Sequence, residues 1–443
     1  MNRYRGGLTG FSVLVTGQGV SLTGSAMASL ALSIWLWQNT QSATAMSLAS
    51  IAYLLPQALL SPIAGAVVDR SGPRRALLTG SGGAATASLF ALALVITGAL
   101  HSWQLYTLNA ITGAFSAVEV PAFTTAMALL VPDADRDRAS GLLTLTQNAT
   151  NILAPVVAGA LIVAAGLGGV LTADLASFAA AVAAILWVRT PAITRPHRTR
   201  LASSLGIRAA ARVIRSRPLL AHLLGLQLAM ATVGAVGMVF LAPLVIARSS
   251  GNPAAVGLVL GFSGAGGVAG GLTMATAGGA LTRRWGRARI ALTSAGLLSL
   301  TGLGLLGVAR TIWLLTAAAT ALTFLLAFFS APLQALWIAA APPDALGRVT
   351  ALRHLLVRGA TPIVMLAAGP TADTIQAHLA RGTQPAWLHT LVGHGPATGM
   401  ATLFLLAAIT GIAVAGAGTR SNALRTANRP NTQTSQATPT PEP

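Results

Sequence analysis

Ionisable side chains inside long apolar segments are the residues of this chain that could do chemistry, and the main ones are Glu119, Arg358 and Asp174. An ionisable group deep in hydrocarbon is costly and is a functional candidate by default. A carboxyl group there can exchange a proton or bind a lipophilic cation, and a guanidinium can hold an anionic group of a substrate or pair with a carboxylate. We predict that these three residues couple proton and substrate movement. Structural alternatives stay open: a carboxyl bonded to a neighbouring helix for Glu119, snorkelling for Arg358, and a cap or latch for Asp174.

The segments that carry these residues are long enough to cross a membrane. Hydrophobic residues make up 54% of the 443 residues and charged residues 8%, which no soluble domain matches. Backbone groups in hydrocarbon must bond within their own segment, so the spans should be α-helices of about 20 residues or more. Twelve spans are predicted, at 11–37, 44–68, 76–98, 105–131, 141–165, 170–188, 219–246, 254–281, 290–308, 312–340, 352–373 and 397–417.

The depth and surroundings of Glu119 favour a functional role. It lies some fourteen residues into the fourth span, about 20 Å from its outer mouth at 1.5 Å per residue. This depth is at or past the membrane midplane. Pro121, two residues on, is expected to break the helix there and to free backbone carbonyls.

The basic residues predict how the chain sits in the membrane. The formal net charge is +19, and all 28 basic residues are arginines. Apolar runs divide them into clusters, so they form no contiguous patch of the kind that binds nucleic acid. If the N-terminus is cytosolic, 24 arginines fall in inward segments and three in outward loops. By the positive-inside rule, both termini are predicted to be cytosolic.

The spans divide into two sets of six. We predict an N-terminal six-helix bundle at 1–188, a basic cytosolic linker at 189–218, a C-terminal six-helix bundle at 219–417 and a disordered cytosolic tail at 418–443. Within the linker, Ser203 to Arg215 has the pattern of a basic amphipathic helix that lies on the anionic inner leaflet. Glycines in the eighth span, such as Gly257, Gly261, Gly266 and Gly270, have the spacing of close helix packing.

Uncharged polar residues predict a cavity between the two bundles. Residues three and four apart share a helix face, which groups the side chains Thr144, Gln147, Asn148 and Asn151. Aligning the fifth and eleventh spans with a shift of 210 residues puts Arg358 on Asn148, so Arg358 should face the same cavity from the other bundle. Gln227 and Gln334 are weaker candidates for its wall. The alternative is that these residues are polar contacts that hold helices together.

A polar loop between the second and third spans is repeated in the second half of the chain. The first copy contains Gly65, Asp69, Arg70, Gly72, Arg74 and Arg75, and the second contains Gly279, Arg284, Gly286 and Arg289. A carboxylate and several guanidiniums at one membrane face can form an ion-pair latch between helix ends that a conformational change makes or breaks. The alternative is a set of charges that only anchors the loop. A second repeat aligns Pro132–Leu142 with Pro343–Leu352, with one extra residue in the first copy.

The loop at 65–75 resembles the signature loop of the major facilitator superfamily, Gly-x-x-x-Asp-Arg-x-Gly-Arg-Arg, with Pro73 as the exception. The run Pro343 to Arg353, together with Asn151 to Pro155 and Asp174 to Phe178, resembles the branch that holds macrolide efflux proteins and catecholate-siderophore exporters. The likeness covers about residues 10–417. It implies the major facilitator fold, two pseudo-symmetric six-helix bundles that alternate access to a central cavity.

Three positions depart from that pattern. The branch usually has a Gly-Asp pair in the first span, where this chain has Gly24 and Ser25. The superfamily's arginine in the fourth span falls on Asn109, and the glycine expected before Pro155 is Ala154. If the missing groups carry protons in relatives, this chain must relay protons through other residues or couple transport to another ion.

These features together predict a multi-pass secondary exporter of the bacterial inner membrane, and not an enzyme. It would move amphipathic small molecules out, with protons as the coupling ion, and it would act as a monomer in contact with membrane lipids. No cofactor, metal site or nucleic-acid partner is predicted. Three alternatives stay open: a dedicated exporter of a siderophore or other metabolite, an importer, and a non-transporting sensor or scaffold that kept the fold.

Overall fold

The computed structural model describes residues 7–132, 135–188, 204–342, 345–381, 391–393, 395 and 397–421. Its first half contains α1 (Gly7–Thr40), α2 (Ala43–Ser71), α3 (Pro73–Ile96), α4 (Ser102–Ser116), α5 (Glu119–Leu130) and α6 (Arg136–Trp187). Its second half contains α7 (Ser204–Ser216), α8 (Pro218–Arg248), α9 (Pro253–Trp285), α10 (Arg287–Leu297), the π-helix η2 (Leu298–Gly304), α11 (Leu305–Val308), α12 (Ile312–Ala340), α13 (Leu346–Ala380) and α15 (Thr398–Arg420). Most of the predicted linker, 189–203, and most of the predicted tail, 422–443, lie outside the described residues.

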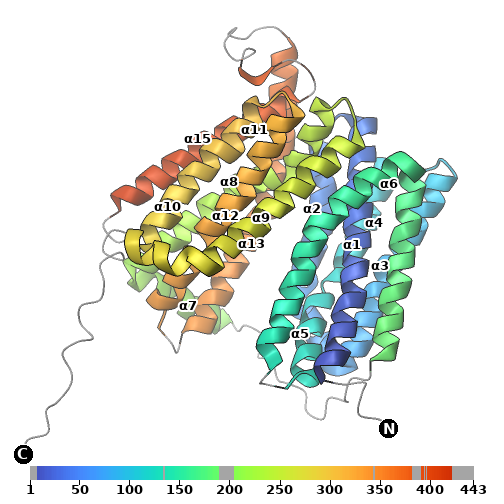
Figure 1. The fold of residues 1–443 in the computed structure, drawn as a ribbon, viewed down its shortest axis with the longest axis horizontal. Coiled ribbons are helices and arrows are strands. Elements are labelled where there is room, and N and C mark those ends of the chain that lie inside the picture. Colours follow the sequence, from blue (N-terminus) through green and yellow to red (C-terminus); the bar gives the residue numbers. More distant parts are fainter. Residues whose placement is uncertain are drawn as a thin grey trace, which may run out of the picture.

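Eleven helices of the described chain are long and apolar enough to cross a membrane, and one of them accounts for two crossings. The span in α6 is 50 residues long, about 75 Å at 1.5 Å per residue, whereas the hydrocarbon layer is about 30 Å thick. Gly166 interrupts it with φ 65° and ψ −172°, a conformation that glycine adopts without steric cost. Figure 1 shows both arms of α6 running from this bend toward the same end of the molecule, so that the chain passes up along one arm and back along the other. The twelve predicted spans and the all-helical fold are confirmed.

Local sequence signals place several helix ends. Ser42, Asn252 and Thr311 are N-caps whose side chains accept hydrogen bonds from the first turns of α2, α9 and α12. Pro73 and Pro218 occupy the first positions of α3 and α8, where the missing N–H of proline has no helical partner to lose.

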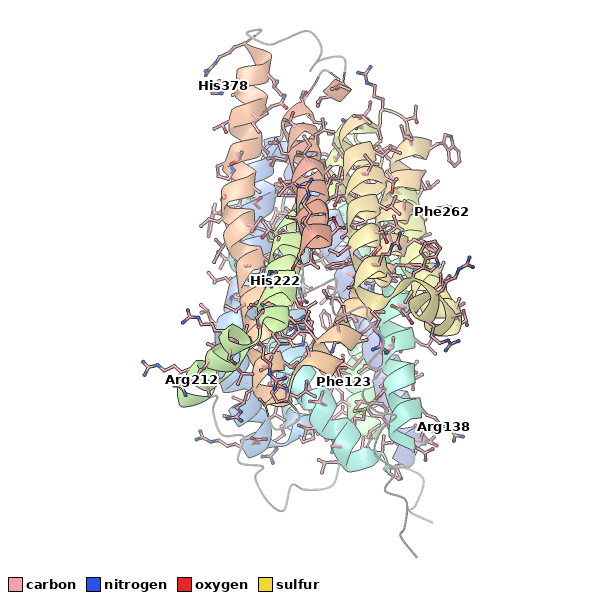
Figure 2. All side chains as sticks on the ribbon, turned by 90° about the vertical axis from the view of Figure 1, so that its left-hand side faces the viewer. Phe123, Arg138, Arg212, His222, Phe262 and His378 are labelled. Carbon is pink, nitrogen blue, oxygen red and sulfur yellow. The ribbon has the colours of Figure 1, made fainter. Side chains whose placement is uncertain are left out.

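The two sets of helices converge at one end of the molecule and diverge at the other (Figure 1). At the converging end, which we call the closed end, residues of both halves form one core that includes Trp37, Met46, Phe240, Met365 and Phe404. Toward the other end, which carries α7 and which we call the arginine-rich end, each half has its own core cluster. Figure 2 shows His378 at the closed end, and Arg138 and Arg212 toward the opposite one. The sides of the membrane that these two ends face stay a prediction.

Glycines allow α6 and α9 to pack backbone against backbone near the closed end. A Cβ added to Gly257 would lie 2.7 Å from the carbonyl oxygen of Pro155, and one added to Gly264 would lie 2.8 Å from that of Asn151. Gly266 packs in the same way on the other side of α9, where a Cβ would lie 2.6 Å from the carbonyl oxygen of Thr320 in α12. The predicted role of these glycines in close helix packing is confirmed.

The internal repeat appears in the backbone. Gly72 and Gly286 both have φ near 80°, both end one helix and begin the next, and each donates its N–H to the carbonyl four residues earlier. In the second repeat, the N–H of Asp135 donates to the carbonyl of Pro132, and the N–H of Ala345 donates to that of Pro342. Pro132 therefore matches Pro342 with no insertion. The predicted alignment with one extra residue is wrong, because the helix start, rather than the Pro-Asp pair, fixes the register.

The predicted amphipathic helix before the second bundle forms as α7, but its apolar face is covered by protein. Ala210 and Ile214 are buried in the cluster that includes residues of α8 and α13. Arg208, Arg212 and Arg215 are exposed. The predicted helix is therefore confirmed, with its apolar face packed against the second bundle, and its position on the inner leaflet stays a prediction.

We expect Gly113 in α4 to be intolerant of any side chain. A Cβ at this position would collide with the backbone carbonyl of Tyr53 in α2, and a backbone atom cannot move aside as a side chain can. Gly113→Ala should therefore destabilise the protein by about 1–3 kcal/mol. The matched control is Gly82→Ala in α3, where no atom lies within 4 Å of the added Cβ. Thermal unfolding in one detergent should show a lower midpoint for Gly113→Ala only.

Candidate functional site

Glu119 lies at a break in the helix that makes the fourth crossing. α4 ends at Ser116, two residues have turn geometry, and α5 begins with Glu119. Pro121 in the first turn of α5 has no N–H to donate to the carbonyl of Ala117, so the helical hydrogen bonds do not continue across this point. The predicted break is confirmed. Glu119 lies 17 residues from the start of α4 and 11 from the end of α5, about 26 and 17 Å along the helix axis.

The carboxyl of Glu119 is placed between α2 and α3. A Cβ on Gly80 of α3 would lie 3.2 Å from Cγ of Glu119, so the glycine leaves room for this side chain. Tyr53 of α2 interacts with the carboxylate electrostatically, and its hydroxyl lies 3.2 Å from Oγ of Ser116. Within the described part of the chain, the structure gives the Glu119 carboxylate no hydrogen-bond donor and no basic partner. A partly buried carboxyl of this kind is a candidate for binding and releasing a proton.

Asp174 ties three helices of the first bundle together. Its side chain is 1% exposed, and it accepts hydrogen bonds from Ser25 of α1 at 3.1 Å and from Ser88 of α3 at 2.6 Å. It lies eight residues beyond the bend at Gly166, about 12 Å along the second arm of α6. Ser25 stands where the resembling exporters carry an aspartate, and here it donates to an aspartate of another helix.

We expect Asp174 to contribute to the stability of the folded protein rather than to the coupling of proton and substrate movement. Asp174→Ala leaves the hydroxyls of Ser25 and Ser88 without their acceptor in a buried site, which should cost about 1–3 kcal/mol. Asp174→Asn has nearly the same shape and keeps an acceptor, so it should unfold close to the unsubstituted protein and keep transporting. Detergent melting curves and gradient-driven transport check both expectations. If Asp174→Asn melted normally but lost gradient-driven transport, Asp174 would be a coupling residue instead.

The polar face of the fifth crossing continues the surface on which the two bundles meet. Asn151 lies where α6 begins to pack on Gly264 of α9. Toward the arginine-rich end, Thr144 and Gln147 on the same face are exposed and Asn148 is half-buried. This part of the face is therefore not covered by α9, and its position on the wall of a central cavity stays a prediction.

Arg358 is exposed on α13. Gly369, eleven residues or about three turns further on and hence on the same face, packs on α2, where a Cβ would lie 2.7 Å from Oγ of Ser47. The face that carries Arg358 is thus directed toward the first bundle. The predicted pairing of Arg358 with Glu119 is not among the contacts of the structure.

Gln227 of α8 and Gln334 of α12, both weaker candidates in the sequence, are brought together in one cavity of about 350 Å³. The residue between them is Arg353 of α13, whose Nη2 donates to Oε1 of Gln334 at 2.7 Å. Sequence reasoning counted Arg353 among the cytosolic arginines of the loop before α13. Its position in the second turn of the helix, beside apolar neighbours, was the signal that it is buried.

Asp373 is a second residue that the sequence did not identify. It lies near the end of α13 at the closed end and reaches across to the first bundle. Its carboxylate accepts hydrogen bonds from Oγ of Ser42 at 2.7 Å, from the N–H of Ala43 at 2.8 Å and from the N–H of Thr44 at 3.0 Å. It therefore caps the N-terminus of α2, where a negative charge is most favourable.

The two copies of the signature loop lie at the arginine-rich end. Arg74 donates to the carbonyl of Leu186 at the end of α6, and Arg70 and Arg75 are exposed. In the second copy, the guanidiniums of Arg284 and Arg289 lie over the ring of Trp285, 5.6 and 5.4 Å from its centre. A latch between the bundles through Asp69 stays a prediction.

Asn109, at the position where the superfamily pattern has an arginine, makes a contact between two helices. Its Nδ2 donates to the carbonyl of Ala49 in α2 at 3.1 Å. Of the histidines in the long outer loop, His378 bonds to its own helix, while His389 and His394 lie outside the described residues. Among the described residues, no three metal-ligating side chains gather into a site.

Two helical bundles that meet at one end, with polar side chains turned toward the space between them, define a membrane transporter of the alternating-access type. The profile of the Major Facilitator Superfamily matches residues 14–365, and the chain belongs to that family. Its role is therefore transport across a membrane, as a multi-pass protein.

Individual relatives agree with this family. Macrolide efflux protein A of Streptococcus pyogenes is 27% identical over 191 residues, which cover 43% of this chain and 47% of that protein; the match thus spans about half the length of this relative. A bacterial homologue of the human lysosomal transporter Spinster, solved in an inward-facing and unoccupied conformation, matches with a TM-score of 0.64 at 14% identity, over 97% of this chain and all of that one. The nucleoside transporter NupG matches with a TM-score of 0.69 at 10% identity, over 93% and 98%. Likeness at these low identities supports the fold alone.

Proposed function

We propose that this protein is a secondary active exporter of amphipathic small molecules in the bacterial inner membrane, driven by proton antiport. The observation that carries the proposal is Glu119, a carboxyl without a hydrogen-bond donor or basic partner among the described residues, at a helix break in the first bundle. A carboxyl in this setting binds a proton from one side and releases it to the other as the bundles rock. The partial similarity to macrolide efflux protein A supports outward transport.

The two ends of the molecule have separate tasks in this proposal. The arginine-rich end faces the cytosol by the positive-inside rule, so the arrangement described above is open inward. Asp373 at the cap of α2 holds the outer end closed in this state. The signature loops at 65–75 and 279–289 form the corresponding contacts at the cytosolic end when the protein opens outward. The bundles at 1–188 and 219–417 are the two rocking bodies.

Comparison of cells and medium by untargeted mass spectrometry, with the gene present and deleted, tests export directly. We expect at least one amphipathic compound to accumulate in the deletion strain and to be depleted from its medium. The same compound, added to proteoliposomes that hold a pH gradient, should release protons down that gradient. A purified protein that binds the compound but moves neither it nor protons would point to the sensor interpretation instead.

A further inference from the structure

The cavity in the second bundle contains a positive charge that no residue of the described chain neutralises. It is lined by Gln227 of α8, by Phe329, Ser330, Leu333 and Gln334 of α12, and by Arg353 of α13. α8, α12 and α13 come from three separate parts of the second half. The cavity, of about 350 Å³, is at the small end of the range for ligand sites.

Arg353 is held in place but is not paired. Its side chain is 4% exposed, its guanidinium lies 5.2 Å from the centre of the Trp337 ring, and one nitrogen donates to Gln334. Its Nε is buried without an acceptor, and no carboxylate among the described residues forms an ion pair with it. A buried guanidinium without a counter-charge is unfavourable, and an anion that enters the cavity removes this penalty.

A second unpaired polar atom belongs to a residue of the cavity lining. Oε1 of Gln227 is buried without a partner, although Gln227 lines the cavity. An amide can turn by 180° and present its NH₂ instead of its oxygen. Arg353 and Gln227 together then offer several N–H donors to one planar group, while Phe329 and Leu333 offer apolar surface beside it. This combination matches a carboxylate attached to an apolar or aromatic body.

We infer that this cavity binds the acidic group of the transported molecule, so that the substrate class is amphipathic organic monocarboxylates. The inference rests on the proposed function, since it treats the cavity as part of the transport site. Arg353, with Gln334 holding it and Gln227 beside it, is the anion contact. Glu119 in the other bundle is then the residue that binds the proton. One guanidinium balances one negative charge, which favours a monoanion over a phosphate or a dicarboxylate.

Calorimetric titration of the full chain in nanodiscs with 2-naphthoate tests the inference, with neutral 2-naphthamide as the matched probe. The unsubstituted protein should bind naphthoate roughly 10- to 100-fold more tightly than the amide, the difference expected for hydrogen bonds to a charged group. Arg353→Gln should remove this preference and leave the affinity for the amide unchanged. The matched control is Arg212→Gln, which removes one exposed arginine of α7 that does not line the cavity and should keep the preference.

Three outcomes would overturn the inference: no binding of naphthoate to the unsubstituted protein, equal affinity for naphthoate and the amide, or an unchanged preference in Arg353→Gln. Arg353→Lys separates charge from folding, because it should keep part of the preference if the site binds an anion. The titration uses no gradient, so a failure of proton coupling leaves its result intact. Conversely, if the cavity bound no anion, the mass-spectrometric comparison would still test export, because it assumes nothing about the charge of the substrate.

Discussion

Glu119→Gln should abolish gradient-driven transport and leave downhill exchange intact. Glutamine has nearly the shape of a protonated glutamate, so it should fit beside Gly80 and Tyr53 while binding no proton. The expected loss is large. Counting the charge of one exchanged proton alone, a membrane potential of 100 mV supplies about 2.3 kcal/mol, which sustains a concentration ratio of about 50, and a substrate that leaves as a monoanion would add its own charge to this driving force. In Glu119→Gln this ratio should fall to about 1.

The measurement is uptake into inside-out vesicles with and without an imposed potential, using the compound that the mass-spectrometric comparison identifies. Glu119→Asp is the control, because it keeps the carboxyl on a shorter side chain and should retain part of the accumulation. Substrate counterflow without a gradient should be similar in all three proteins. Normal accumulation by Glu119→Gln would mean that the proton is carried elsewhere, and Asp174 would then be the next residue to replace.

The features that the sequence predicted correctly are local ones. The hydropathy of twelve segments, the break near Pro121, the turns at Gly72 and Gly286 and the glycine spacing of α9 each depend on a few neighbouring residues. Such signals act through backbone geometry and through the period of a single helix. They do not require knowledge of which helices touch. The prediction of two helices within α6 was correct for the same reason, because its two arms, joined at Gly166, each have the length of one crossing.

The features that the sequence did not predict depend on two or three helices at once. Arg353 looked like one more cytosolic arginine, because its burial depends on Trp337 and Gln334 of α12. Asp373 was only the last residue of a predicted span, because its partners at the start of α2 are more than 300 residues away. The apolar face of α7 fitted a lipid surface and α8 equally well. Helix rotation and depth decide each of these contacts, and the sequence of one segment does not fix them.

The contact of Asp373 with α2 links this geometry to the transport cycle. It joins the two bundles at the closed end, whereas Asp174 joins helices of one bundle only. A hydrogen bond within one bundle is kept while the bundles rock, but a hydrogen bond between them must break each time the closed end opens. We therefore expect the Asp373 contact to favour the state that is closed at this end over the state that is open there.

Asp373→Ala should accordingly shift the protein toward the state that is open at the closed end. The variant loses the acceptor of three hydrogen bonds, two of them from the first N–H groups of α2. A hydrogen bond to a charged group contributes about 1.5–3 kcal/mol. A loss of this size should move the equilibrium between the closed and the open state of this end roughly 10- to 100-fold. The chain has no cysteine, so two introduced cysteines can be spin-labelled without background. Trp103 of α4 and Trp313 of α12, 65% and 75% exposed at the closed end, are suitable positions.

Pulsed electron spin resonance between labels at these two positions measures the opening. In Asp373→Ala the longer-distance population should grow at the expense of the short one. Asp135→Ala is the matched control, because this aspartate bonds only within its own helix end, to the exposed Arg138 at 3.2 Å, and should leave the distances unchanged. If the distances in Asp373→Ala equalled those of the control, the apolar core shared by Trp37, Phe240 and Phe404 would be sufficient to hold that end closed. The carboxylate would then serve only to cap α2.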